Sequence, residues 1–233
     1  MKPEFVTFTG LDESTDIERV LDLSARYPVE WGILFSKDRT GKEKRFPALQ
    51  MVEHLFIRKG LRLSAHICGK YARDIVDGGH AEIGGFLKGF FERVQINVGA
   101  VPRNGDLHAA DFAIGIKAKH AILQTRDSFP TTDAVDWLFD RSGGRGEVPT
   151  YWPVTMSTNP AFCGYAGGIG PENVVEVLEQ IIKWKMPGKP YWIDMEGKIR
   201  SHDFIDLDKC EAVLKAVYGK FAPTHPSERK EAE

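Results

Sequence analysis

Residues 163–174, Cys-Gly-Tyr-Ala-Gly-Gly-Ile-Gly-Pro-Glu-Asn-Val, join a short apolar run to two adjacent glycines and then to the start of an amphipathic run. This order predicts a β-strand, a tight turn and the first turn of a helix. The glycines at 167 and 168 can bring the backbone close to a ligand, and the helix that follows points its positive end at the same place. The stretch predicts a site for phosphate or another small anion, or else a plain turn that needs left-handed torsions.

Similar strand-to-helix units recur along the whole chain. Several expected strands are short apolar runs without alternation, which is typical of parallel strands buried on both faces. The expected strands cover residues 5–9, 31–36, 62–67, 93–98, 121–125, 137–140, 162–166 and 191–195. Apolar stripes with the period of a helix predict helices over residues 15–25, 47–59, 174–185 and 207–218.

Repeated units of this kind predict a parallel sheet with right-handed connections. Eight expected strands favour a closed (β/α)8 TIM barrel, with a doubly wound open sheet as the alternative. No linker divides the sequence, so we expect one barrel domain over residues 1–221. The end of the chain, residues 222–233, is polar and has no apolar stripe, and we expect a disordered tail there.

The composition restricts the class of protein. A formal net charge of −2 argues against a general nucleic-acid binder. The cysteines, Cys68, Cys163 and Cys210, are odd in number and far apart, which argues against disulfides or structural zinc and favours a cytoplasmic setting. The sequence has no signal-peptide pattern and no apolar run of membrane-spanning length. We expect no nucleic-acid or membrane partner and no cofactor, and either a monomer or a homodimer.

In a barrel, the last residues of every strand surround one mouth, where active sites are built. Side chains two positions before a strand end point the same way, and long loops are expected nearby at 37–46, 99–110 and 141–152. The polar side chains placed there are Thr7, Thr9, Ser36, His66, Cys68, Gln95, Asn97, Gln124, Arg126, Asp140, Tyr165, Asp194 and Glu196. A dry core would not need so many polar groups, so their gathering predicts a binding site.

Asp140 ends an apolar strand, where an aspartate costs free energy unless it is solvated, paired or hydrogen-bonded. It could cap the loop behind it or act as a general acid. His66 and Cys68 share a strand face and could form an acid/base pair or a nucleophile, or be packed and inert. Four residues could in principle hold a metal ion: His66, Asp140, Asp194 and Glu196. Their spacing matches no tight metal-ligand motif, so we expect no metal.

Basic residues crowd one of the expected loops. They are Lys37, Arg39, Lys42, Lys44 and Arg45. Such a loop is either a solvated surface or a lid whose cations pair with a carboxylate or a phosphate.

Several segments, in the same order, resemble the phosphoribosylanthranilate isomerase family of tryptophan biosynthesis. Residues 166–174, Ala-Gly-Gly-Ile-Gly-Pro-Glu-Asn-Val, resemble its seventh strand and phosphate-binding turn, and residues 135–146 resemble its sixth strand and the following loop. Residues 94–99 are similar to its fourth strand, residues 31–36 with Arg45-Phe46 to its second, and residues 191–197 to its eighth. The resemblance covers most of the chain.

The resemblance implies a barrel that binds a small phosphorylated or anionic sugar and converts an aldose to a ketose by an Amadori rearrangement. This reaction needs a general acid to open the sugar ring and a general base to take a proton from the sugar's second carbon. Asp140 falls on the family's acid. Arg45, with Arg39 as the competing choice, falls on the arginine that meets the substrate's carboxylate. The Gly167–Gly168 pair falls on phosphate-binding backbone.

Two positions depart from the family. Thr9 stands where the family places its catalytic cysteine, and a threonine hydroxyl is a poor base unless another group activates it. Glu196-Gly197 replaces a small serine-glycine turn, and this carboxylate would repel a phosphate unless Lys198 or Arg200 compensates. The loop after the fourth strand also lacks the family's acidic residue.

Three hypotheses follow. The chain is an isomerase that has moved its base, with Cys68 as the candidate, or a related barrel enzyme acting on another anionic sugar or amino compound, or a non-catalytic binder of a small anion. The predicted catalytic residues are Asp140, Thr9 and Cys68. The predicted substrate-binding residues are Arg45, Asn97, Arg126, Gly167, Gly168, Asp194 and Glu196.

Overall fold

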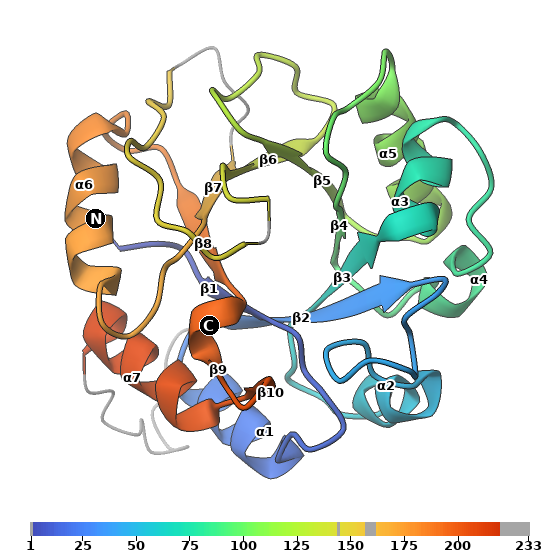
Figure 1. Ribbon diagram of the computed structural model, residues 1–233, viewed down its shortest axis with the longest axis horizontal. Helices are drawn as coiled ribbons and strands as arrows, with labels where there is room; N and C mark the ends of the chain where they lie inside the picture. The colour runs from blue at the N-terminus through green and yellow to red at the C-terminus, as the bar shows by residue number, and fades with distance from the viewer. Residues whose placement is uncertain (1, 144, 157–161, 220–233) are drawn as a thin grey trace, which may run out of the picture.

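The computed structural model describes residues 2–143, 145–156 and 162–219. Its centre is a closed barrel of eight parallel strands in sequence order, with helices around it (Figure 1). The strands are β1 (Val6–Thr9), β2 (Val29–Ser36), β3 (Leu63–Cys68), β4 (Arg93–Ile96), β5 (His120–Thr125), β6 (Asp136–Asp140), β7 (Cys163–Ala166) and β8 (Tyr191–Met195). The expected TIM barrel is confirmed, and the open sheet is excluded because β8 pairs with β1.

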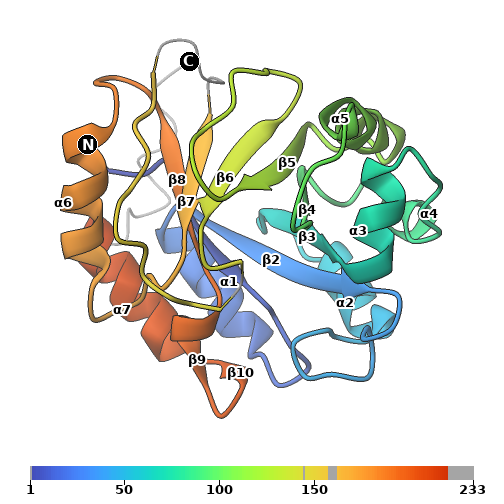
Figure 2. The ribbon, with the colours of Figure 1, turned by 45° about the horizontal axis from the view of Figure 1, so that its top comes forward.

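The helices that the apolar stripes predict are all present. They are α1 (Ile17–Arg26), α2 (Leu49–Phe56), α6 (Val174–Trp184) and α7 (Leu207–Tyr218). Sequence analysis did not identify α3 (Gly69–Val76), α4 (Gly84–Leu87) and α5 (Gly105–Gly115). After β8 come a short 3-10 helix, η1 (Gly197–Ile199), and a small hairpin of β9 (Arg200–Ser201) and β10 (Phe204–Ile205) (Figure 2).

The expectation of a loop over residues 99–110 is wrong in its second half, because α5 begins at Gly105. Its large apolar side chains Leu107 and Ile114 are exposed, whereas the small Ala109 and Ala113 are buried. The apolar residues are thus spread around the helix and leave no stripe to read. In the described residues, loops follow β5 and β6, whereas helices follow the other strands of the barrel (Figure 1).

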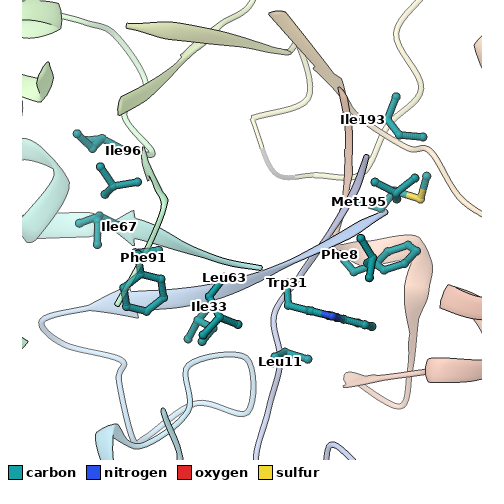
Figure 3. Close-up of a cluster of buried hydrophobic side chains, with 14 of the residues drawn as sticks. Phe8, Leu11, Trp31, Ile33, Leu63, Ile67, Phe91, Ile96, Ile193 and Met195 are labelled. Atoms are coloured by element: carbon teal, nitrogen blue, oxygen red, sulfur yellow. The ribbon is translucent and has the colours of Figure 1, made fainter. Parts of the chain in front are cut away.

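Alternation along the strands separates the core from the barrel interior. Phe8 on β1, Trp31 on β2 and Ile193 on β8 belong to the main cluster of buried apolar side chains (Figure 3). Because successive side chains on a strand point to opposite faces, their neighbours Thr9 and Asp194 turn toward the barrel interior. The packing of one face therefore determines which polar groups meet at the mouth.

The amino-terminal end of the barrel interior is closed by an ion pair and an aromatic plug. Arg93 Nη1 donates to Glu30 Oε1 over 2.9 Å, and both side chains are buried. The Arg93 guanidinium also lies 4.1 Å from the ring centroid of Trp192. Trp192 pairs in register with Gly164 on β7, and a Cβ built on Gly164 would overlap the indole. Among the described residues these side chains fill this end of the interior, and the cavity described below opens at the opposite end.

The two ends of the described chain lie together, since the Tyr218 hydroxyl donates to the Pro3 carbonyl over 3.1 Å. The expected domain end at residue 221 and the expected tail, residues 222–233, lie outside the described residues. None of the described helices combines the length and the apolar character needed to cross a bilayer.

Substituting Gly164→Ala should destabilise the fold by about 1–3 kcal/mol, because the added methyl must displace the Trp192 indole from a packed interior. Thermal unfolding followed by circular dichroism measures the change. The matched control is Gly115→Ala at the end of α5, where a Cβ would meet no atom within 4 Å. An equal stability of the two variants would show that the packing around Trp192 is loose enough to accommodate the added methyl group.

Candidate active site

A cavity of about 500 Å³ opens at the carboxyl ends of the barrel strands. Every predicted catalytic or substrate-binding residue except Arg126 lines it, whereas three other polar residues expected at the mouth, Thr7, Ser36 and Tyr165, do not. These lining residues are Thr9, Arg45, Cys68, Asn97, Asp140, Gly167, Gly168, Asp194 and Glu196. The strand-end argument from the sequence therefore brings together side chains that lie up to about 190 positions apart along the chain.

Arg126 is placed differently. It follows the end of β5, its side chain is exposed, and it is not among the residues that line the cavity. A side chain built on Gly143 would meet the Arg126 guanidinium. Arg126 thus lies beside the loop after β6 and outside the set of residues that line the cavity.

A buried hydrogen-bond chain crosses the floor of the cavity. Thr9 Oγ1 lies 2.8 Å from Asp194 Oδ1 and 3.4 Å from His66 Nδ1. Gln95 Nε2 lies 3.2 Å from the same His66 nitrogen, and Ser64 Oγ lies 3.0 Å from His66 Nε2. An amide nitrogen can only donate, so Nδ1 accepts and the imidazole proton lies on Nε2. The chain links side chains from β8, β1, β3 and β4, and it passes β2 between β1 and β3.

His66 is neutral at physiological pH. Burial, helped by the positive charge of Arg93, lowers its pKa to about 3. Gly32 makes room for the ring, since a Cβ there would lie 2.7 Å from Thr9 Oγ1 and 2.8 Å from His66 Nε2. The ring nitrogens face Thr9, Gln95 and Ser64 rather than Cys68, so the acid/base pair of His66 with Cys68 is not formed.

Cys68 is a thiol rather than a thiolate. Burial raises its pKa to about 11, against the opposing effects of the Asn97 hydrogen bond and the nearby Arg39. Asn97 Nδ2 lies 3.4 Å from the Cys68 sulfur, and Gln95 Nε2 donates to Asn97 Oδ1 over 3.0 Å. A thiol held in this way is a weak proton acceptor at neutral pH.

Asp140 is buried at the end of β6. The Ser142 hydroxyl donates to Asp140 Oδ1 over 2.7 Å. In the strand register Asp140 pairs with Ala166, which in turn pairs with Asp194. The two carboxyls therefore stand in one row, separated by the small side chain of Ala166. Ser142 was not identified from the sequence, although a serine two positions after a strand-end aspartate is a common partner in a turn.

Asp194 is the most perturbed carboxyl of the cavity. Burial, together with Glu196, Glu30 and Asp140, raises its pKa to about 8, against the opposing effect of the hydrogen bond from Thr9. It therefore holds its proton at neutral pH more often than not. Carboxyls with such shifts, placed in a cleft, are candidates for proton transfer.

The glycine turn after β7 has the torsions expected from the sequence. Gly167 has φ of 110° and Gly168 has φ of 61°, values that side chains disfavour. Asn173 fastens the turn, because its side-chain oxygen accepts from Gly170 N over 2.8 Å and its amide donates to Gly168 O over 3.0 Å. Both glycines line the cavity beside Lys198, so a turn geometry and an anion site are compatible here.

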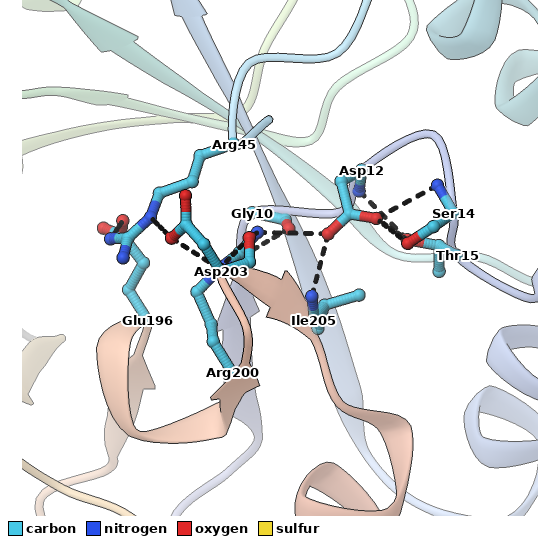
Figure 4. Close-up of polar contacts among 9 residues, drawn as sticks. All are labelled: Gly10, Asp12, Ser14, Thr15, Arg45, Glu196, Arg200, Asp203 and Ile205. Atoms are coloured by element: carbon cyan, nitrogen blue, oxygen red, sulfur yellow. Dashed lines mark hydrogen bonds and ion pairs between the residues drawn. The ribbon is translucent and has the colours of Figure 1, made fainter. Parts of the chain in front are cut away.

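Arg45 is held by two carboxylates (Figure 4). Its Nη1 lies 2.8 Å from Glu196 Oε1, and its Nε lies 2.6 Å from Asp203 Oδ1. Arg200 was one of the two cations expected to compensate Glu196. Its Nη2 instead forms an ion pair with Asp12 Oδ2 over 3.0 Å. Arg45 is therefore the compensating cation for Glu196. Asp203 carried no signal in the sequence, because it lies 158 positions from Arg45.

Arg39 is the more available cation. It lines the cavity, its guanidinium stacks 4.1 Å from the Phe46 ring centroid, and its Nε lies 3.5 Å from Ser36 Oγ. Within the described ranges no carboxylate pairs with it. Of the two arginines weighed from the sequence, Arg39 is the one whose charge is free to meet an anion.

No group of three or more His, Cys, Asp and Glu side chains in the described part of the chain is arranged to hold a metal ion. Carboxyl groups, a neutral imidazole, a thiol and a few cations are among the groups that line the cavity.

A closed barrel of eight parallel strands with helices around it defines a (β/α)8 barrel. TrpF from Jonesia denitrificans has the same fold, with a TM-score of 0.61 and 15% identity over 92% of this chain and 97% of that one. N-(5'-phosphoribosyl)anthranilate isomerase from Pyrococcus furiosus gives a TM-score of 0.57 and 14% identity over 91% and 98% of the two chains. A form of the dimeric enzyme from Thermotoga maritima gives 0.57 and 12%, over 92% and 98%.

The resemblance read from the sequence is confirmed by these structures at the level of the fold. No family model matches the sequence, and no curated protein sequence matches it. At identities this low the likeness shows the fold alone, so the reaction has to be argued from the residues of this chain.

Cys68 should react slowly with iodoacetamide in the native protein at pH 7.5, because a thiol with a pKa of about 11 holds almost no thiolate there. Peptide-level mass spectrometry measures the labelling, and the unfolded protein serves as the control. The rate should rise as the pH approaches 11. Rapid labelling of native protein at pH 7 would restore Cys68 as a base.

Proposed function

We propose that this chain is an isomerase that converts a small phosphorylated or otherwise anionic amino sugar from an aldose to a ketose by general acid/base catalysis. The observation that carries the proposal is the pair of carboxyls, Asp140 and Asp194, which stand in one register row and line one cavity. The fold shared with phosphoribosylanthranilate isomerases supports the same class of reaction.

Asp140 is the proposed general acid. It gives its proton to the ring oxygen of the sugar, the bond between that oxygen and the first carbon breaks, and the nitrogen lone pair forms a C=N bond. Ser142 keeps the carboxyl in place through the 2.7 Å hydrogen bond. A buried acid of this kind typically contributes about 10²–10⁴-fold to the rate.

The charged ends of the substrate have separate partners in the proposal. A phosphate would meet the Gly167–Gly168 backbone and Lys198, which line one side of the cavity. A carboxylate would meet Arg39. The Glu196 charge does not prevent either, because Arg45 neutralises it over 2.8 Å. The Glu196 carboxylate after β8 is therefore compatible with an anionic substrate in the cavity.

Among the hypotheses from the sequence, a non-catalytic binder predicts an occluded mouth, or else an Asp140 locked in a salt bridge with Arg141 or Arg145. The mouth bordered by described residues is open to a cavity of about 500 Å³, which favours an enzyme. A related enzyme acting on another anionic sugar keeps the same acid and the same cavity, and substrate profiling distinguishes it.

Substituting Arg39→Gln should raise KM for the anionic substrate by about 10-fold or more, because a charge-assisted hydrogen bond contributes about 1.5–3 kcal/mol. Substituting Arg45→Gln should also raise KM, but through the uncompensated Glu196, so the double variant with Glu196→Gln should recover most of the loss. Steady-state kinetics measures all three variants. If Arg39→Gln left KM unchanged, the carboxylate partner would have to be sought elsewhere in the cavity.

Purified protein should consume phosphoribosylanthranilate, followed by the loss of substrate fluorescence, and Asp140→Asn should reduce the rate by about 10²-fold or more. Asp133→Asn, an exposed aspartate before the same strand, is the matched control and should keep the rate. Folded wild-type protein without turnover would remove this reaction and direct the search to other anionic sugars.

A further inference from the structure

The strand-end threonine at the expected base position leaves the proton acceptor of the reaction unassigned. We propose that Asp194 is the general base of the cavity and that Thr9 is the positioning residue that holds its carboxyl. This inference rests on the proposed function and deepens it. Three observations carry it: the register row, the hydrogen bonds of Thr9, and the state of the competing groups.

The register row places the two carboxyls on either side of a gap. Asp140 on β6 and Asp194 on β8 are separated by Ala166 on β7. Neighbouring strands lie about 4.8 Å apart, so the two backbones are about 10 Å apart. Both side chains line the cavity, and the methyl of Ala166 leaves the space between them open. A sugar carbon placed there has an acid on one side and a base on the other.

The competing groups are poor acceptors. His66 is neutral, but burial keeps its pKa at about 3, so it gains little by taking a proton. Cys68 is a thiol whose pKa is about 11. Glu196 is paired with Arg45. The Thr9 hydroxyl faces Asp194 and His66, and neither activates it to an alkoxide at neutral pH.

Asp194 is faced by Thr9 from β1, Glu30 from β2, Asp140 from β6 and Glu196, which directly follows β8. Burial and the three neighbouring carboxyl groups oppose its ionisation, and the hydrogen bond from Thr9 favours it, with a resulting pKa of about 8. A base with this value accepts a proton from carbon better than an ordinary carboxylate does. The positive C=N group formed after ring opening would favour the ionised form when it is needed.

Thr9 serves both protonation states of Asp194. When the carboxyl is ionised, the hydroxyl donates to Asp194 Oδ1 over 2.8 Å. When it is protonated, the carboxyl can donate to Thr9 Oγ1, and the hydroxyl proton can turn to His66 Nδ1 at 3.4 Å. A hydroxyl adapts to both arrangements because it is a donor and an acceptor at once. A threonine at this position is therefore consistent with a base on the neighbouring strand.

The step balances without a cofactor. Asp194 takes the proton from the second carbon of the ring-opened sugar, and the electron pair of that C–H bond becomes a C=C bond to the first carbon. The electrons of the C=N bond return to nitrogen. Transfer of the enol proton away and of a proton to the first carbon then gives the ketose, with no net oxidation.

The kinetic test compares Asp194→Asn, Thr9→Val and the exposed control Asp111→Asn with wild type on phosphoribosylanthranilate between pH 6 and 10. We expect the wild-type rate to rise with an apparent pKa near 8, because the base must be ionised. Asp194→Asn should lose about 10²-fold or more. Thr9→Val should keep turnover but shift the rising limb to higher pH, since a donor to the carboxylate is lost. Asp111→Asn should match wild type.

An independent test uses thermal unfolding of wild type and Asp194→Asn from pH 4 to 9. The unfolded carboxyl ionises near 3.8 and the folded one near 8, so the folded state binds more protons between these values. Wild-type stability should therefore fall relative to the variant as the pH rises through this window. The melting-temperature difference should grow from pH 4 to 8 and then level off.

The outcomes separate the two proposals. Active wild type with an active Asp194→Asn variant would overturn the base and leave the isomerase standing. Inactive wild type would overturn the isomerase, and the thermal difference would then decide on Asp194: a difference that is flat with pH would overturn its assignment as a perturbed base, and a growing one would support it.

Discussion

Pairing between β1 and β8 is the constraint on which the rest of this protein depends. It closes the sheet, so that Val6 lies beside Ile193 and Thr7 beside Asp194. Closure brings the inward-facing side chains of all the strands into one interior, where polar groups must find partners because water is excluded. The Thr9–Asp194 contact lies across this seam, and neither residue would meet the other in an open sheet.

The barrel interior contains polar side chains at both ends, and they are stabilised differently at the two ends. At the filled end, Glu30 and Arg93 form a buried ion pair beneath the Trp192 indole. At the open end, a hydrogen-bond chain through His66 satisfies side chains that do not carry full charge at neutral pH. A chain of neutral groups avoids the large desolvation cost of buried ions and leaves Asp194 as the group whose ionisation the surroundings control.

The cations at the mouth are divided between structure and binding. Arg200 is buried with Asp12, and Arg45 bridges Glu196 and Asp203, so the loop after β2 is fastened to the hairpin after β8. These pairs neutralise acidic groups near the cavity. Among the cations that line the cavity, Arg39 and Lys198 can each contribute positive charge toward a bound anion.

The amino-acid sequence by itself predicted the eight strands and the glycine turn after residue 166, because apolar strand patterns and paired glycines are local signals. It favoured a closed barrel and left an open sheet as the alternative, which the pairing of β8 with β1 excludes. It also predicted most residues of the cavity, since strand ends of a parallel barrel converge. Helix α5 was not predicted because its apolar residues do not form one stripe: Leu107 and Ile114 are exposed, whereas Ala109 and Ala113 are buried. Only the tertiary structure decided that Arg45 is neutralised by carboxylates more than 150 positions away along the chain. It also decided that Arg126 is not among the residues that line the cavity, and that burial keeps Cys68 a thiol. Charge pairing and burial are long-range properties, and the spacing of residues along a chain does not encode them.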